Sequence, residues 1–287
     1  MTKVISTINL KGGVGKTSLT VALAEFLADE SDYKVLVIDV DPQTNATVSL
    51  ISQEDWKNLD QNGKTLASLF KDKIRGMHEF NLNDSIVKNV SNVHGGIKNL
   101  DLLPSSLKLI DLQDLLSQIP SITRYSLSPV EVLQKEMNEI IESNKYDYIF
   151  IDCPPNLGLI TQNALRMSNY YLIPVVPDII STLGIPQIIS NVESLSKLWN
   201  SKIECLGIVL TKVKAVQLHR SQITFLKNKS RDKEYPKILD SEIKDTVKAQ
   251  EALDIDNSPP TLKGKYSYGL YEQYHHLKEE FLQLCPV

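Results

Sequence analysis

Several short segments of this chain are apolar almost without interruption, and these segments limit its possible folds most. One of them is Lys34–Val40, "KVLVIDV". A strand of this composition is typically buried on both faces, as in parallel sheets that helices cover from both sides. We expect further strands with similar apolar runs at Val4–Asn9, Tyr146–Cys153, Tyr170–Val176 and Ile203–Thr211.

Helical patterns alternate with these strands. Apolar residues at helical spacing follow the first strand, and further helices are predicted at Leu159–Met167, Ile185–Trp199 and Gly269–Leu284. A strand, a helix and a second parallel strand form a right-handed unit. The alternation therefore predicts an α/β fold with a doubly wound, mostly parallel, twisted sheet and helices on both faces.

We expect the 287 residues to form a single domain, residues 1–287, because no long linker or internal repeat divides them. Residues 52–95 are polar and contain the turn signals "DQNGK" and "NVHGG". This less regular region is expected to hold a helix or two joined by mobile loops.

Composition favours a cytoplasmic protein. No run reaches the roughly 18 apolar residues that a membrane helix needs, and the N-terminus enters a strand without a secretory pattern. The three cysteines are too scattered for a disulfide framework or a Cys-x-x-Cys metal site. Since the net charge is −4, any binding to nucleic acid must come from a local basic patch.

The segment "KGGVGKTS" lies between a predicted strand and a predicted helix. Glycines at this place let backbone N–H groups and the helix N-terminus form a cradle for phosphate. Lys16 would reach the β- and γ-phosphates, the Thr17 hydroxyl would bind Mg²⁺, and Ser18 could contact the α-phosphate. The usual first glycine of such a loop would fall at Leu10, and the next residue is a second lysine, Lys11.

Three acids end apolar strands. Asp39 and Asp41 lie in "IDVDPQTNAT", and Asp152 lies in "YDYIFIDCPPNLG". Open α/β sheets build their sites at the carboxyl ends of their strands. Asp152 has the position expected of a Walker B acid near Mg²⁺.

The segments KGGVGKT, DVDPQTN and YDYIFIDCPPNLG, in this order, resemble the ParA/Soj/MinD family of deviant Walker A ATPases, with most similarity to the partition branch. "LDLLPSS", "NALRMSNYYLIPV", "GIVLTK" and "VKAQEA" also have counterparts there. The resemblance implies a P-loop NTPase fold, with ATP and Mg²⁺ as ligands. The residues then expected to bind ATP are Lys11, Gly12, Gly13, Val14, Gly15, Lys16, Thr17 and Ser18, with Thr211 and Lys212 near the adenine.

The resemblance also assigns roles. Lys11 is expected to reach across an ATP-bound dimer to the phosphates of the other subunit's nucleotide, as an arginine finger does, so that Lys11, Lys16 and Asp41 are the catalytic residues. Asp41 would orient or deprotonate the attacking water. Asp39 and Asp152 would hold Mg²⁺ through its waters, beside Thr17. The segments expected to act as switches are Pro42, Gln43 and Thr44, and the loop that begins with Pro154.

Basic residues gather between Lys212 and Lys233, where Asp232 is the only acid. Such a run is often a solvated helix face, but it can also bind DNA phosphates. Partition ATPases bind DNA through basic residues in this half of the fold. We therefore expect contacts to duplex DNA, without sequence reading, from Lys214, Arg220, Lys227, Lys229 and Lys248.

The function that the resemblance implies is that of a ParA-type ATPase associated with the nucleoid. It would form a homodimer with ATP, bind DNA, and hydrolyse ATP slowly until a ParB-like or adaptor protein stimulates it, thereby positioning a plasmid, a chromosome or a protein organelle.

One alternative is a nucleotide-gated scaffold with little hydrolysis. A MinD-like membrane protein would need a basic amphipathic tail, whereas the acidic tail "YEQYHHLKEEFLQLCPV" predicts a packing helix. A nitrogenase-reductase-like protein would need two cysteines near a dimer axis.

Overall fold

The computed structural model describes residues 1–77, 79–117 and 128–287, and its strands form one sheet. The strand order is β3-β2-β4-β1-β5-β6-β7, and each of these neighbouring pairs is parallel. This confirms the predicted α/β fold. The strands are β1 (Lys3–Thr7), β2 (Val35–Asp39), β3 (Leu100–Leu103), β4 (Tyr148–Asp152), β5 (Tyr170–Val175), β6 (Glu204–Val213) and β7 (Ile238–Lys244).

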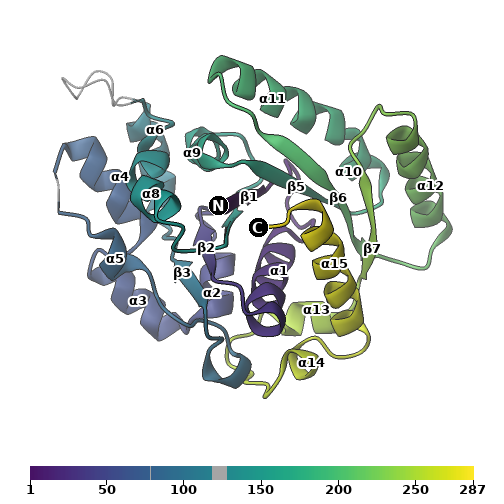
Figure 1. Cartoon of the computed structure of the whole chain (residues 1–287), viewed down its shortest axis with the longest axis horizontal. Coiled ribbons are helices and arrows are strands. Elements are labelled where there is room, and N and C mark those ends of the chain that lie inside the picture. The colour runs from purple at the N-terminus through teal and green to yellow at the C-terminus, as the bar shows by residue number, and fades with distance from the viewer. Residues whose placement is uncertain (78, 118–127) are drawn as a thin grey trace.

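Helices cover both faces of the sheet (Figure 1). On one face lie α1 (Lys16–Ser31), α2 (Asn45–Leu50), α3 (Gln53–Gln61), α13 (Val247–Glu251), α14 (Leu262–Lys265) and α15 (Leu270–Leu284). On the other lie α4 (Leu66–Arg75), α5 (Leu82–Ser85), α6 (Leu109–Leu116), α8 (Val132–Glu142), α9 (Leu159–Met167), α11 (Ile185–Leu198) and α12 (Gln217–Arg231).

The central strands show why their sequences are continuously apolar. In β4, Tyr148 and Phe150 pack in the core beneath α1 and α15, while Ile149 and Ile151 pack in the core of the opposite face. Because successive side chains of a strand point to opposite faces, a strand between two helical layers needs an apolar residue at every position.

Two parts of the sequence were predicted less well. Residues 52–95 contain three α-helices, α3, α4 and α5, and a 3-10 turn at Val93–Gly95, so that "a helix or two" is an underestimate. The edge strands β3 and β7 were not predicted. Strand β3 has only four residues, and β7 exposes Asp240 and Lys244, which breaks the apolar run.

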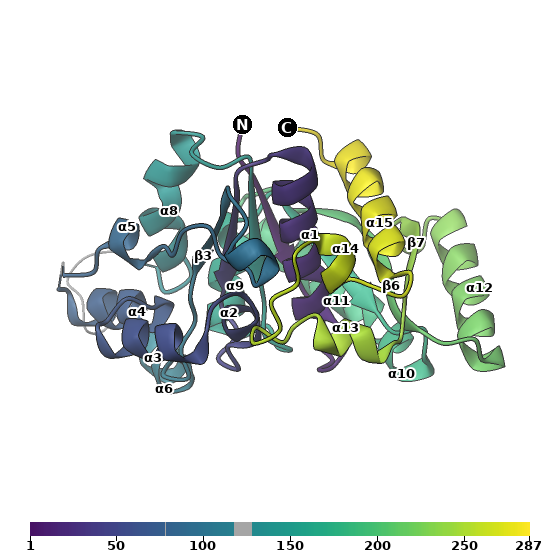
Figure 2. The same ribbon diagram turned by 90° about the horizontal axis from the view of Figure 1, so that it is seen from below.

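The register of the strands brings their carboxyl ends to one level. Asp152 at the end of β4 pairs with Thr7 of β1 on one side and with Asp39 of β2 on the other. Figure 2 shows α10 (Ile179–Leu183) and α13 at this edge of the molecule, whereas both chain termini lie at the opposite edge. Within the described ranges, none of the helices has the length and the apolar character that a membrane crossing demands.

Candidate functional site

The glycine-rich loop between β1 and α1 is fixed by side chains from neighbouring strands. The Asn9 amide donates to the carbonyl of Pro174 at 2.7 Å, and its oxygen accepts from the backbone N–H of Lys11 at 2.9 Å. The Thr211 hydroxyl donates to the carbonyl of Val14 at 2.7 Å. Gly15 precedes α1 with φ at 85°, in the left-handed region where a side chain adds strain. The loop is therefore held in a shape that requires this glycine.

This loop forms one wall of an open cleft of about 480 Å³. Its lining combines predicted residues with others that sequence reasoning missed. The predicted ones are Gly12, Gly13, Gly15, Lys16, Thr17, Ser18, Asp41, Gln43 and Lys212, with Pro155 in the loop that begins with Pro154, and the missed ones are Asn45, Val48, Ser49 and Leu253. A recess of about 140 Å³ adjoins the cleft and shares Gly15, Ser18, Lys212 and Leu253 with it; Thr211 lines this recess. The cleft and the recess together offer room for an elongated polar ligand.

Thr17, which lines the cleft, contacts the buried Asp152 behind it. The Thr17 hydroxyl donates to Asp152 Oδ2 at 2.6 Å, and the Asp152 side chain is fully buried. Among the described residues, none donates a hydrogen bond to the other carboxylate oxygen, Oδ1. Burial, with Asp39 nearby, raises the pKa of Asp152 well above its usual range. A buried oxygen without a donor beside a threonine hydroxyl fits a hydrated Mg²⁺ ion, which would supply the missing partner.

Lys16 lies close to these acids. Its side chain is largely buried, and its Nζ lies 3.4 Å from the carbonyl oxygen of Lys11. Burial lowers the pKa of Lys16, and the nearby carboxylates of Asp152 and Asp41 oppose that shift. A buried ammonium gains most from an anionic partner, so the cleft is suited to a phosphate group at this position.

Asp39 holds the following segment in place. Its Oδ1 accepts from the backbone N–H of Asp41 at 3.1 Å, and its Oδ2 accepts from the N–H and the hydroxyl of Thr47 at 2.9 and 2.7 Å. Burial raises the pKa of Asp39 to about 7. The geometry therefore makes Asp39 a support for Asp41, whereas its predicted contact to Mg²⁺ through water stays a prediction.

Asp41 is positioned from several sides. Its Oδ1 accepts from the backbone N–H of Gln43 at 2.9 Å, and its carbonyl accepts from the Ser105 hydroxyl at 2.7 Å. The Thr47 hydroxyl in turn accepts from the N–H of Ser105 at 2.9 Å. Sequence reasoning missed the supporting roles of Thr47 and Ser105, although Ser105 lies in the segment "LDLLPSS" that has counterparts in the family and Thr47 follows two residues after "DVDPQTN".

The two predicted switch segments border the cleft differently. Thr44 precedes α2 with φ at 57°, an unusual backbone conformation for a β-branched residue. Gln43 lines the cleft on this side. On the other side Pro154 is buried, and its exposed neighbour Pro155 is the residue that lines the cleft.

Lys11 is not among the residues that line the cleft. Its Nζ instead lies 2.9 and 3.2 Å from the two carboxylate oxygens of Asp178 and 3.0 Å from the Ser181 hydroxyl. Asp178 and Ser181 belong to the start of α10. The second lysine of the loop thus faces its own subunit's α10.

The residues predicted to contact DNA, which we call the basic surface, are Lys214, Arg220, Lys227, Lys229 and Lys248. Four of the five lie on or beside α12, at the β7 edge of the sheet (Figure 1). The lysines are paired with carboxylates of the same chain. These pairs are Lys214–Asp245 at 3.2 Å, Lys227–Glu242 at 3.5 Å, Lys229–Glu234 at 2.6 Å, and Lys248–Glu251. The acids come largely from β7 and the turns around it, outside the run that sequence reasoning considered.

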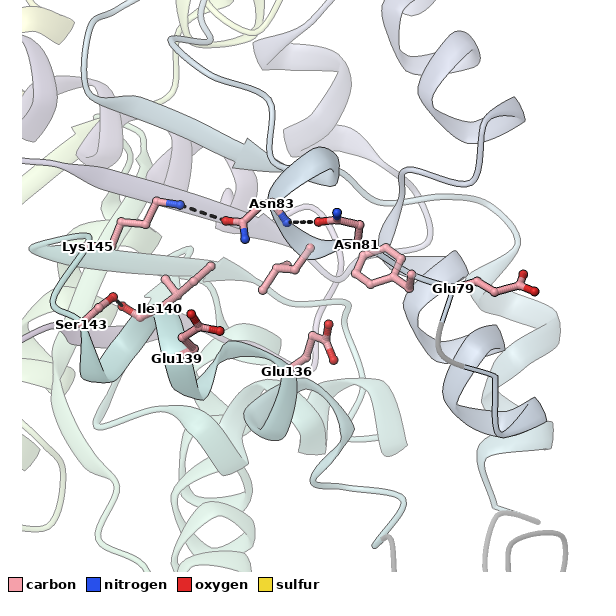
Figure 3. A pocket seen from close by; sticks show the side chains of 10 residues that line it. Glu79, Asn81, Asn83, Glu136, Glu139, Ile140, Ser143 and Lys145 are labelled. Atoms are coloured by element: carbon pink, nitrogen blue, oxygen red, sulfur yellow. Dashed lines mark hydrogen bonds between the residues drawn. The ribbon is translucent and has the colours of Figure 1, made fainter.

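A further cleft, of about 440 Å³, lies between α8 and the segment around α5 (Figure 3). Its labelled carboxylates are Glu79, Glu136 and Glu139, and Glu136 pairs with Lys73 at 2.9 Å. None of the predicted site residues lines it. The residues predicted to bind a nucleotide therefore lie around the cleft beside the glycine-rich loop.

The chain is similar to known proteins in sequence and in fold. A family model described as an AAA domain matches residues 2–205. The sporulation initiation inhibitor protein Soj of Bacillus subtilis is 32% identical over 241 residues, which are 83% of this chain and 84% of that protein. A putative plasmid partition protein of Borrelia burgdorferi, solved with AMPPNP bound, has a TM-score of 0.75 at 22% identity and covers 99% of both chains.

A second solved structure is a cobyrinic acid a,c-diamide synthase of Mycobacterium smegmatis with ADP and magnesium bound. Its TM-score is 0.73 at 21% identity, covering 99% of this chain and 95% of that one. At these identities the two structures establish a shared fold alone.

Proposed function

Since the chain belongs to the ParA/Soj/MinD family of P-loop ATPases, we propose that it is a partition ATPase that forms a homodimer with ATP and positions an intracellular cargo. The observation that carries the ATPase part is the hydrogen bond from Thr17 to the buried Asp152 beneath the glycine-rich loop, with Lys16 beside it. Together they offer a threonine hydroxyl, a carboxylate oxygen to which none of the described residues donates, and a buried ammonium.

The chain's own residues would act as follows. The glycine-rich loop binds the phosphates, and Lys16 neutralises the β- and γ-phosphates. Mg²⁺, held by Thr17 and through water by Asp152 and Asp39, would offset phosphate charge. Asp41 orients the attacking water, because its backbone is fixed by Asp39 and Ser105 while its side chain lines the cleft.

In the proposed dimer, Lys11 contacts the nucleotide of the other subunit. A cation supplied in this way stabilises the charge that develops during phosphoryl transfer. It also makes hydrolysis depend on dimerisation, because one subunit alone lacks the second lysine at its phosphates. A ParB-like or adaptor protein would stimulate this slow reaction.

The dimer would bind double-stranded DNA through the basic surface, and the protein would then be associated with the nucleoid. The alternative of a membrane-bound protein has less support. The C-terminal helix α15 packs against α1 and β7, and its Glu280 accepts hydrogen bonds from the backbone of Asp240. An acidic helix used for packing in this way does not favour binding to anionic lipid.

Two variants test this function by separating Asp41 from Lys11. Asp41→Ala should reduce ATP hydrolysis at least about 100-fold, as expected when the group that positions water is lost. The ATP-bound dimer should still form and stay on DNA. Lys11→Ala should also lose hydrolysis. This variant should still bind ATP, but it should dimerise poorly. A charge-assisted contact contributes roughly 1.5–3 kcal/mol, and two such contacts per dimer predict a loss of about two to four powers of ten in dimer affinity.

Light scattering and DNA retention, each with ATP and Mg²⁺, are the measurements. Lys108→Ala is a matched control, because Lys108 is also an exposed lysine in an ion pair, with Asp60 at 2.8 Å. It should behave as the unmodified protein. If Lys11→Ala dimerised and held DNA as firmly as Asp41→Ala, the role of Lys11 at the other subunit's nucleotide would be wrong.

A further inference from the structure

The three donors of the Lys11 ammonium have three acceptor atoms within reach in its own subunit. They are the two Asp178 oxygens, at 2.9 and 3.2 Å, and the Ser181 hydroxyl, at 3.0 Å. An ammonium group has three N–H donors, so these contacts account for all of them. Lys11 can reach the phosphates of a second nucleotide only after it leaves Asp178.

Asp178 is itself held in place to receive the lysine. Its Oδ1 accepts from the backbone N–H of Ser181 at 2.8 Å, which caps the start of α10. Partial burial raises the pKa of Asp178, but the Ser181 N–H and Lys11 outweigh this effect and bring the pKa below its usual value. The carboxylate is therefore ionised at neutral pH whether or not Lys11 stays.

The Lys11–Asp178 ion pair can separate at little cost, so that Lys11 can exchange Asp178 for another anion. The side chains of Lys11 and Asp178 remain 38% and 27% exposed, so that water can solvate both groups when they separate. An exposed pair of this kind contributes little to stability. A nucleotide phosphate carries more negative charge than one carboxylate, so it can compete for the same lysine.

We propose that Asp178 and Ser181 hold Lys11 in the resting subunit, and that dimerisation requires Lys11 to exchange Asp178 for the phosphates of the other subunit's nucleotide. Asp178 is then a positioning residue, and its hold on Lys11 weakens the affinity with which the ATP-bound dimer forms. This inference rests on the role of Lys11 in the proposed function. It adds that the lysine is restrained before the dimer forms.

Asp178→Asn tests the restraint, because asparagine keeps the size of the side chain and also caps helices well, while the negative charge is lost. The dimer formed with ATP and Mg²⁺ should become roughly 2- to 30-fold tighter, as expected when two weak exposed pairs no longer have to break. Sedimentation at a series of protein concentrations measures this dissociation constant. The affinity of the isolated subunit for ATP should stay unchanged.

Two further variants complete the experiment. In a Lys11→Ala background, Asp178→Asn should have no effect on dimerisation, because there is no lysine left to release. Asp240→Asn, which removes an exposed acid from β7, should leave the dimer unchanged and so controls for net charge. An Asp178→Asn dimer that is as tight as the unmodified one, or weaker, would overturn the restraint.

The experiment also distinguishes this inference from the proposed function. If the unmodified protein dimerises with ATP and Asp178→Asn does not tighten the dimer, the restraint alone is wrong. If both proteins stay monomeric with ATP at every concentration, the proposed dimer is wrong, and the restraint falls with it. If only Asp178→Asn dimerises, both are supported.

Discussion

The cleft beside the glycine-rich loop and the basic surface both contain lysine side chains, but these lysines have different surroundings in the two regions. In the cleft, Lys16 is only 7% exposed and has the buried acids Asp152 and Asp41 as electrostatic partners. On the basic surface, Lys214 and Lys227 are 58% and 48% exposed, and each already has a carboxylate partner. The first environment is buried within the fold, whereas the second consists of ion pairs at the surface.

This difference predicts how each region responds to change. Removal of one member of a buried charged group leaves the others without a partner, which is costly. An exposed pair contributes little, and salt screens it further. Single substitutions should therefore have large effects in the cleft and small, salt-dependent effects on the basic surface.

The largest expected effect is at Lys16. Lys16→Ala should weaken ATP binding about 100-fold or more, because charge-assisted contacts to two phosphates are lost at roughly 1.5–3 kcal/mol each. Calorimetric titration with ATP and Mg²⁺ measures this affinity. Lys227→Ala, the counterpart on the basic surface, should keep its ATP affinity within about twofold. If the two variants lost a comparable share of their affinity for ATP, the expected difference between the cleft and the basic surface would be wrong.

An intermediate effect is expected from the buried acid Asp39. Burial raises its pKa from 3.8 to about 7 in the folded state. The unfolded chain therefore releases this proton near pH 4, whereas the folded protein keeps it until about pH 7. The stability that the protonated acid contributes is complete below pH 4 and is lost as the pH rises towards 7, at up to about 1.4 kcal/mol per pH unit.

Asp39→Asn should flatten the decline in the free energy of unfolding between pH 4 and 7, measured by urea unfolding without nucleotide or Mg²⁺. Some decline should remain, because burial also raises the pKa of Asp152. Asp240→Asn, an exposed acid at the edge of the sheet, should leave the slope unchanged. Equal slopes for the unmodified protein and Asp39→Asn would show that Asp39 ionises normally in the folded state.

The smallest expected effect is on DNA. Glu242 lies 3.5 Å from Lys227, so its carboxylate should oppose a DNA phosphate at the same place. Glu242→Gln should raise the affinity for duplex DNA about two- to fivefold at low salt, and the gain should shrink as salt is added. Fluorescence anisotropy with a labelled duplex measures it.

Glu204→Gln provides the matched control, since Glu204, the first residue of β6, is also exposed and is paired with Lys202. It should not change the affinity for DNA. An unchanged affinity for Glu242→Gln would place the DNA contact away from Lys227.

The sequence predicts the fold and the position of the glycine-rich loop between β1 and α1 well, for a common physical reason. Central parallel strands must be apolar at every position, and a phosphate cradle needs glycines and a lysine at fixed spacing. Both constraints act on consecutive residues. Helix α9 was predicted at the same bounds, Leu159–Met167, that the structure shows.

Other features depend on contacts between distant segments, which a pattern of consecutive residues does not reveal. Ser105 supports Asp41 across 64 residues, and Asp178 binds Lys11 across 167. The run around α12 is basic when it is considered alone, but β7 adds Glu242 and Asp245 beside its lysines. The edge strands were missed because one is short and the other is partly polar.

The position of β1 in the middle of the sheet has a consequence for the synthesis of the protein. Its Lys3 pairs with Tyr148 of β4, and its Ile5 pairs with Tyr170 of β5. Strand β1 therefore leaves the ribosome well before its neighbours β4 and β5 exist, and α1 leaves it well before α15. Such non-local contacts slow folding and leave apolar surface exposed on an unfinished chain. During translation, the glycine-rich loop is made well before Lys212 and Leu253, which line the same cleft, so that the cleft is complete only after these later segments have been made.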